Sequence, residues 1–240
     1  MADPSPRAGP RLTGAGVART LTVVAMLAAS AAICFLAAGT LGVGRAWLYY
    51  GGLLAYLVLA MVSMLVLFPQ AIETVNARGR FHRDVKTWDK VFTLVYTPLL
   101  LLEPAVAGWD ARRGATFGGG WPVTALALAA TVAAYAFAHW AMVANPYAET
   151  GVRIQGERGH AVISSGPYRL VRHPFYAALV VTQLAYPVAL ASPAAFVPAL
   201  AICGLFVWRT AREDRTLRRE LEGYEAYTAR TRYRLVPGVW

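Results

Sequence analysis

Long apolar runs constrain the fold of this chain more than any other feature. Leu21–Leu41 is 21 residues long without a charged side chain, Ala46–Phe68 is 23 and Trp121–Ala144 is 24. About 20 apolar residues in a helix cross the hydrocarbon core of a bilayer. Charged residues make up only 15% of the chain, whereas soluble domains carry about 25%. The sequence therefore predicts an all-α integral membrane protein.

Three further apolar segments extend the expected bundle to about six transmembrane helices. Val91–Trp109 is a fourth candidate, while Phe175–Ala191 and Ala194–Trp208 are shorter. The intervening Ser192-Pro193 is a turn signal, so the last two segments predict a tight helical hairpin. The polar sequence of residues 209–232 then predicts a cytoplasmic C-terminal helix that leaves the membrane.

Composition divides the chain into three expected parts. Residues 1–16 are rich in Pro, Gly, Ala and Arg and predict a disordered N-terminal tail. Residues 17–144 predict a four-helix transmembrane bundle. Residues 145–240 predict a cytoplasmic loop, the helical hairpin and the C-terminal helix, so any site that needs polar groups falls in this last part.

The net charge of +10 is distributed unevenly between the two sides of the predicted bundle. With a cytoplasmic N-terminus and six spans, 20 of the 23 basic residues are cytoplasmic, and the other side carries Arg45, Arg112 and Arg113. This is the positive-inside pattern, so we expect both termini in the cytoplasm and the protein in the cell inner membrane. Topology accounts for the basic excess, so we expect membrane lipids as partners and no nucleic acid. The oligomeric state stays open.

The segment Ser165–Tyr176 concentrates polar chemistry immediately before the hairpin. Two arginines, a histidine, two tyrosines and two prolines lie within twelve residues. Beyond the hairpin, Arg209 and Glu213 are four residues apart and share a helix face. A hairpin brings its two ends to one side of the membrane, so both segments are expected to face one pocket. The alternatives are a surface ion pair and interfacial snorkelling.

Together these motifs resemble the isoprenylcysteine carboxyl methyltransferase family, which overlaps with the membrane phospholipid methyltransferases. The resemblance covers roughly Trp121 to Trp240 and rests on Gly166-Pro167-Tyr168, Arg172-His173-Pro174 with Tyr176, Arg209 with Glu213-Asp214, Tyr224, Tyr227 and Pro237. The chain departs from the family pattern at Ala178, where Gly is frequent, and at Asp214, where Glu is frequent. The polar stretch Lys86–Lys90 resembles a pattern in bacterial members.

The resemblance implies an S-adenosylmethionine-dependent membrane methyltransferase, with residues 145–240 as its cofactor-binding catalytic region. The implied catalytic residues are Arg172, Arg209 and Glu213. The implied cofactor-binding residues are Gly166, Pro167, Tyr168, His173, Tyr176, Glu213 and Asp214. The acceptor is expected to be a lipophilic small molecule or lipid, methylated on a carboxylate at the cytoplasmic face. Alternatives are a phospholipid or small-lipid N-methyltransferase and, in another class, a non-catalytic membrane protein or a transporter.

Four polar or sulfur-bearing residues inside the apolar runs carry weaker signals. Glu103 and His139 are intramembrane ionisable groups, for which both a functional role and a helix-packing role stay open. Cys34 and Cys203 are far apart in apolar segments, which favours packing over a disulfide. The histidines lack metal-ligand spacing, so we expect no metal site.

Overall fold

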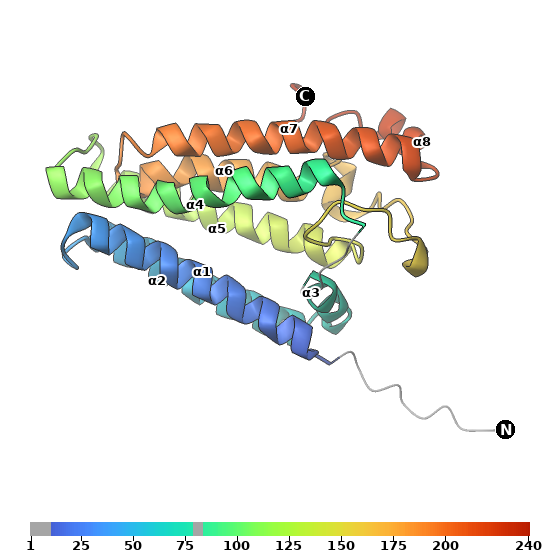
Figure 1. Ribbon diagram of the computed structural model, residues 1–240, viewed down its shortest axis with the longest axis horizontal. Coiled ribbons are helices and arrows are strands. Elements are labelled where there is room, and N and C mark those ends of the chain that lie inside the picture. The colour runs from blue at the N-terminus through green and yellow to red at the C-terminus, as the bar shows by residue number, and fades with distance from the viewer. Residues whose placement is uncertain (1–10, 79–83) are drawn as a thin grey trace.

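The computed structural model describes residues 11–78 and 84–240, and the elements in these ranges are helices. The prediction of an all-α chain is therefore confirmed for the described residues. The long helices lie roughly parallel or antiparallel to one another (Figure 1). In chain order the elements are α1 (Gly14–Ala38), α2 (Gly44–Val66), η1 (Pro69–Ala71), α3 (Ile72–Arg78), α4 (Thr87–Arg113), α5 (Gly120–Ala144), η2 (Gly156–Arg158), η3 (Gly166–Arg169), α6 (Pro174–Leu190), α7 (Phe196–Glu220) and α8 (Tyr224–Arg230).

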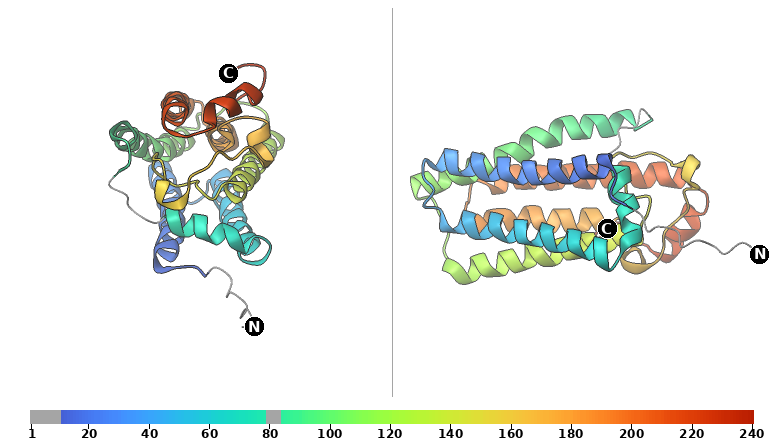
Figure 2. Two further views of the ribbon diagram at one scale, coloured as in Figure 1. Left: turned by 90° about the vertical axis from the view of Figure 1, so that its right-hand side faces the viewer. Right: turned by 90° about the horizontal axis from the view of Figure 1, so that it is seen from below.

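The two ends of the bundle differ in their connections. Figures 1 and 2 show α3, the loop between α5 and α6, and α8 gathered at one end, with the short turns at the other. Helix α5 packs on α6, α6 and α4 both pack on α7, and α1 packs on α4. The polar segments, although far apart in sequence, therefore meet at a single end of the molecule.

Within the part of the chain that the structure describes, four helices are long and apolar enough to cross a membrane, namely α1, α2, α4 and α5. Helix α6 is apolar but only 17 residues long, and α7 changes from apolar to strongly charged along its length. Large side chains such as Leu36, Leu59, Leu94 and Leu126 point outward and are exposed, as lipid-facing residues would be. The chain is thus an integral membrane protein by composition and fold, and four of the six expected spans meet the length and composition criterion.

Helix α1 begins inside the segment that was predicted to be a disordered tail. Thr13 caps it, because its Oγ1 accepts a hydrogen bond from the Gly16 amide at 3.3 Å. Asn76 Oδ1 in turn accepts from the Thr13 amide at 2.9 Å, which ties α1 to α3. Residues 14–16 are therefore helical, and residues 1–10 lie outside the described residues.

The turn of the hairpin is fixed to α4 by a buried carboxylate. Asp110 Oδ2 accepts hydrogen bonds from Ser192 Oγ at 2.7 Å and from the Ala194 amide at 2.8 Å. The predicted turn at Ser192-Pro193 lies where expected, between Leu190 and Phe196. With the turn anchored to α4, and α7 packed along α4, the hairpin is held in a defined position.

The intramembrane polar residues take different environments. His139 Nε2 lies 3.3 Å from Ser63 Oγ, which joins α5 to α2 in the way expected of a helix–helix contact. Glu103 is 3% exposed, and its Oε1 has no hydrogen-bond partner among the described residues. Cys34 is buried and Cys203 partly buried, and neither forms a disulfide.

Candidate active site

The first residues of α6 are held by the C-terminal segment of the chain. The amide of Arg172 donates to Tyr233 O at 2.9 Å, and the amide of His173 donates to Arg234 O at 2.9 Å. Pro174 follows as the first residue of the helix, where a missing amide costs nothing. Residues 233–234 therefore run alongside the start of the hairpin and close the site on that side.

Arg172 forms a buried, two-pronged ion pair with Asp214 on α7. Its Nε and Nη2 donate to the two carboxylate oxygens at 2.7 and 3.2 Å. Its Nη1 donates to Thr231 O at 2.9 Å and to Arg232 O at 2.6 Å. All three guanidinium nitrogens are thus engaged by the protein, so the side chain holds α7 and the C-terminal segment to α6.

Asp214 is the centre of this network. Besides Arg172, it accepts hydrogen bonds from Tyr224 Oη at 3.1 Å and Arg234 Nε at 3.0 Å, and His173 Nε2 lies 3.4 Å from Oδ1. Burial alone would raise the pKa of Asp214, but hydrogen bonds from His173, Arg172 and Arg234 hold that pKa well below its usual range. The carboxylate is therefore ionised and saturated with protein donors.

Tyr176 connects the two ends of the hairpin through Glu213. Its hydroxyl donates to Glu213 Oε2 at 2.6 Å, while its ring stacks on that of His173 with centroids 5.9 Å apart. Glu213 Oε1 makes no hydrogen bond within the described residues, and the side chain is only half-buried. The imidazole and the carboxylate that were predicted to share a pocket thus lie on either side of one tyrosine.

The side chain of Arg209 extends from α7 to α4 and does not pair with Glu213. Its Nη2 donates to Asp89 Oδ2 at 3.2 Å and to Thr150 O at 2.8 Å. Its Cζ also lies 5.1 Å from the centre of the Tyr176 ring. Asp89 Oδ2 in turn accepts from the Val152 amide at 2.9 Å. This second ion pair therefore fastens the loop after α5 over the ends of α4 and α7.

The Gly-Pro-Tyr motif forms η3 and links α5 to α8. Gly166 has φ +57, and a Cβ there would lie 3.2 Å from Trp140 Nε1, so glycine allows both the backbone conformation and the close approach. Pro167 is buried behind it. Tyr168 Oη accepts from Asn145 Nδ2 at 3.0 Å, and its carbonyl accepts from Tyr227 Oη at 2.7 Å.

Arg78 is a further candidate that the sequence analysis treated only as a topology signal. Its Cζ lies 4.8 Å from the centre of the Phe175 ring, and its Nη1 donates to Ala148 O at 3.2 Å. No acidic group pairs with it within the described residues. Burial, together with repulsion from Arg19, lowers the pKa of Arg78 to about 10. A half-buried guanidinium without a carboxylate is costly unless an anion joins it.

Asp89 and Arg234 were also missed as members of the network. The signal for Asp89 was its position at the start of an apolar run within the stretch that resembled bacterial members. The sequence around Arg234 gave no comparable signal, because its hydrogen bond to Asp214 forms only when the C-terminal segment packs back against α7. In the described ranges, no group of three or more His, Cys, Asp and Glu side chains is placed to hold a metal ion.

Fold and site together define an all-α membrane protein with an interlocked charged site at one end of its bundle. Residues 125–219 match the sequence model of the isoprenylcysteine carboxyl methyltransferase (ICMT) family. The matched region runs from α5 to α7, and over these residues the chain is similar to that family, in agreement with the resemblance found in the sequence. The family is one of methyltransferases. No curated protein matches the chain.

Proposed function

We propose that the protein transfers a methyl group from S-adenosylmethionine to the carboxylate of a lipophilic acceptor at the cytoplasmic membrane face. The observation that carries the proposal is the placement of Glu213, whose free oxygen lies where both ends of the family's hairpin meet. Arg78, a cation without an acidic partner among the described residues, lies beside Phe175, the residue before Tyr176. A carboxylate that can bind the cofactor, Glu213, and a cation that can bind the acceptor, Arg78, fit this reaction.

The donor and acceptor groups of the site fit the cofactor. S-adenosylmethionine supplies a methyl group on a positively charged sulfur, and it carries hydroxyl and ammonium donors. Glu213 Oε1 would accept from these donors, because Tyr176 occupies only the other carboxylate oxygen. His173, held by its backbone amide and by the Asp214 contact, would present its imidazole beside them. The negative charge of Glu213 also favours a cationic ligand.

The remaining network residues act through their neighbours. Arg172 and Asp214 use their polar atoms on each other and on the C-terminal segment, so we propose that they position His173 and α7. Arg209 similarly fixes the loop through Asp89 and Thr150 and supports the Tyr176 ring. Rigid placement of two reactants, with water excluded, lowers a displacement barrier by several kcal/mol. No covalent protein nucleophile is needed.

Arg78 favours a carboxylate acceptor over an amine. A guanidinium pairs with carboxylates through parallel hydrogen bonds and repels ammonium groups. Its position on α3 places it next to Phe175, on the first turn of α6. We therefore propose that the Arg78 guanidinium orients the acceptor carboxylate, because Arg172 and Arg209, the two arginines implied as catalytic, are engaged by the protein itself.

The proposed reaction can be tested with the purified full-length chain in detergent. We expect label from methyl-labelled S-adenosylmethionine to enter a prenylated cysteine with a free carboxylate, as an ester that mild alkali releases. A matched acceptor with its carboxylate already amidated should take up no label. Label that appears in an alkali-stable phospholipid amine would instead establish N-methylation.

Arg78→Gln separates the acceptor role from the cofactor role in the same assay. The variant should raise the acceptor KM at least tenfold while it leaves the Kd for S-adenosylmethionine within twofold of the native value. Arg212→Gln, an exposed change on α7, serves as the matched control. Equal acceptor KM values for the two variants would show that Arg78 does not bind the acceptor. The proposed methyl-transfer reaction would not be contradicted by that result.

We also propose that both termini and the active site face the cytoplasm of the cell, with the protein in the inner membrane. The support is the positive-inside charge pattern, together with the gathering of α3, the α5–α6 loop and α8 at one end of the bundle (Figure 1). A phosphatase reporter, active only outside the cytoplasm, should be silent when fused after Trp240 and active when inserted after Gly118. The opposite pattern would invert the topology.

A further inference from the structure

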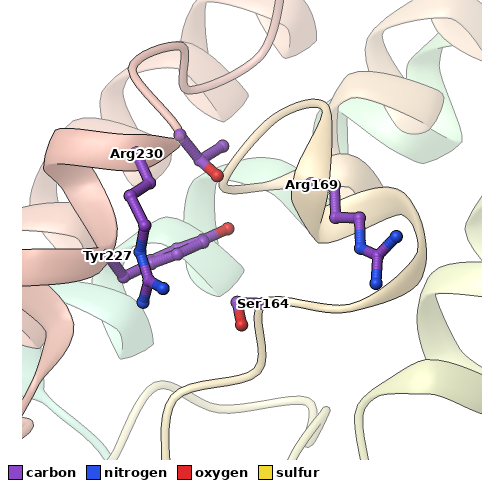
Figure 3. Close-up of a pocket in the computed structure, with 5 residues that line it drawn as sticks. Ser164, Arg169, Tyr227 and Arg230 are labelled. Carbon is purple, nitrogen blue, oxygen red and sulfur yellow. The ribbon is translucent and has the colours of Figure 1, made fainter.

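We propose that a second pocket, separate from the methyl-transfer site, binds a phosphate group. The pocket has a volume of about 370 Å³ and lies between the loop after α5, η3 and α8 (Figure 3). Ligand sites in proteins commonly have volumes of this order. Its lining residues are Ser164, Arg169, Tyr227, Arg230 and Thr231. Two of the five are arginines, and none is acidic.

The two guanidinium groups are available to a ligand. Arg169 and Arg230 are both exposed, and among the described residues neither forms an ion pair or a side-chain hydrogen bond. Each stands at the C-terminal end of a short helical element, where a cation is mildly stabilising by itself. This helix-end stabilisation accounts for an arginine at each position separately. It does not account for the presence of both arginines in the lining of one pocket.

Strong hydrogen bonds fix the two walls of the pocket relative to each other. Tyr168 O, on η3, accepts from Tyr227 Oη at 2.7 Å and from Thr231 Oγ1 at 3.3 Å. Tyr227 is 1% exposed and Thr231 is 7% exposed, so both hydroxyls are buried in this contact. Arg169, the residue after Tyr168, and Arg230, between Tyr227 and Thr231, are therefore carried by walls that are already joined. The backbone segments that carry the two cations are thus held in place before a ligand binds.

The chemistry of the lining selects a phosphate. Arginine forks bind phosphate oxygens with two parallel hydrogen bonds each. Ser164 adds a hydroxyl that lies between Arg230 and Arg169 in the view of Figure 3. None of the five lining residues is His173, Tyr176 or Glu213, the residues that carry the proposed methyl-transfer site. We therefore treat the pocket as a site of its own.

Both a lipid headgroup and a soluble phosphate would present the same chemistry. Leu170, which directly follows Arg169, and Tyr233, which follows Thr231 by two residues, are exposed side chains with apolar surface. Such residues at the end of a membrane bundle suit the headgroup region of a bilayer. A phosphate carried by an anionic phospholipid is therefore the source that we expect, with a negative membrane surface supplying it.

The test uses the full-length chain in a neutral detergent, without S-adenosylmethionine, and follows binding by calorimetry. The probes are dihexanoyl phosphatidic acid, dihexanoyl phosphatidylcholine and inorganic phosphate. We expect the phosphatidic acid to bind, and the double variant Arg169→Gln/Arg230→Gln to weaken it at least tenfold. Arg215→Gln/Arg219→Gln, with two exposed arginines of α7 changed, is the matched control and should bind like the native protein.

Each outcome decides one point. Equal binding of inorganic phosphate and phosphatidic acid would support the site and identify a soluble ligand as sufficient. Equal losses in the pocket and control variants would overturn the proposal, because they would indicate a non-specific charge effect. Ser164→Asp offers a second variant that keeps both arginines, and unchanged binding there would also contradict it. Since no methyl donor is present, these results are independent of the proposed reaction.

Discussion

Replacing Asp214 with asparagine should destabilise the folded protein by about 3–5 kcal/mol, the cost of removing one partner from a buried ion pair. Asparagine has nearly the same shape, but it leaves the buried Arg172 guanidinium without a counter-charge. Its NH2 group also puts a donor in place of one of the two carboxylate oxygens, of which Oδ1 accepts from Tyr224 and Oδ2 from Arg234. Thermal unfolding in detergent, followed by circular dichroism, measures the effect.

Glu220→Gln is the matched control for this change. It lies on the same helix and pairs with Lys86 at 2.7 Å, but that ion pair is largely exposed, so a loss of about 0–1 kcal/mol is expected. Comparable losses of stability in the two variants would contradict the central role of Asp214.

The Asp214→Asn variant should also change how the stability of the protein depends on pH. The pKa of Asp214 is lowered in the folded protein, so the unfolded chain binds a proton first as the pH falls. The stabilisation is complete above the unfolded pKa of about 4, and it is lost progressively below that value. Asp214→Asn should lack this component, so its stability should fall less steeply between about pH 4 and pH 2 than that of the native protein.

Glu213→Gln should weaken S-adenosylmethionine binding at least tenfold, which corresponds to about 1.4 kcal/mol. The amide can still accept from Tyr176, so the fold should be preserved, but the negative charge is lost and Oε1 or Oε2 becomes a donor. Equilibrium binding of labelled cofactor in detergent measures the change, again with Glu220→Gln as the control on the same helix.

His173→Ala should weaken cofactor binding to a similar degree, because the imidazole stacks on Tyr176 and contacts Asp214. The His173 ring also contributes to packing, so the melting temperature of His173→Ala must be compared with that of Glu213→Gln. If both variants are folded and both bind the cofactor with native affinity, the pocket lies elsewhere.

The sequence predicted the helices well because their signals are local. The apolar run Trp121–Ala144 became α5 (Gly120–Ala144), and the turn at Ser192-Pro193 separates α6 from α7. Hydrophobic length and turn residues are properties of neighbouring positions, so they can be read without a structure. The predicted C-terminal helix differed, because α7 continues without a break from the apolar segment to Glu220 and the chain then turns into α8.

The partners of the charged residues were less predictable. Arg209 shares a helix face with Glu213, but it pairs with Asp89, 120 positions away. Arg172 was expected to face a substrate, but it binds Asp214 and two backbone carbonyls near residue 231. Pairings of this kind depend on which distant segments of the chain pack against one another. The spacing of residues within one segment does not predict that packing.

The hydrogen bonds that the C-terminal segment makes to Arg172 and His173 have a consequence for biosynthesis. The hairpin precedes Thr231 and Arg232 in the chain, so the carbonyl acceptors at these two positions are synthesised after it. Until those residues have been made, Arg172 lacks two of its partners. The proposed site would therefore stay incomplete in a nascent chain that already contains all the membrane helices.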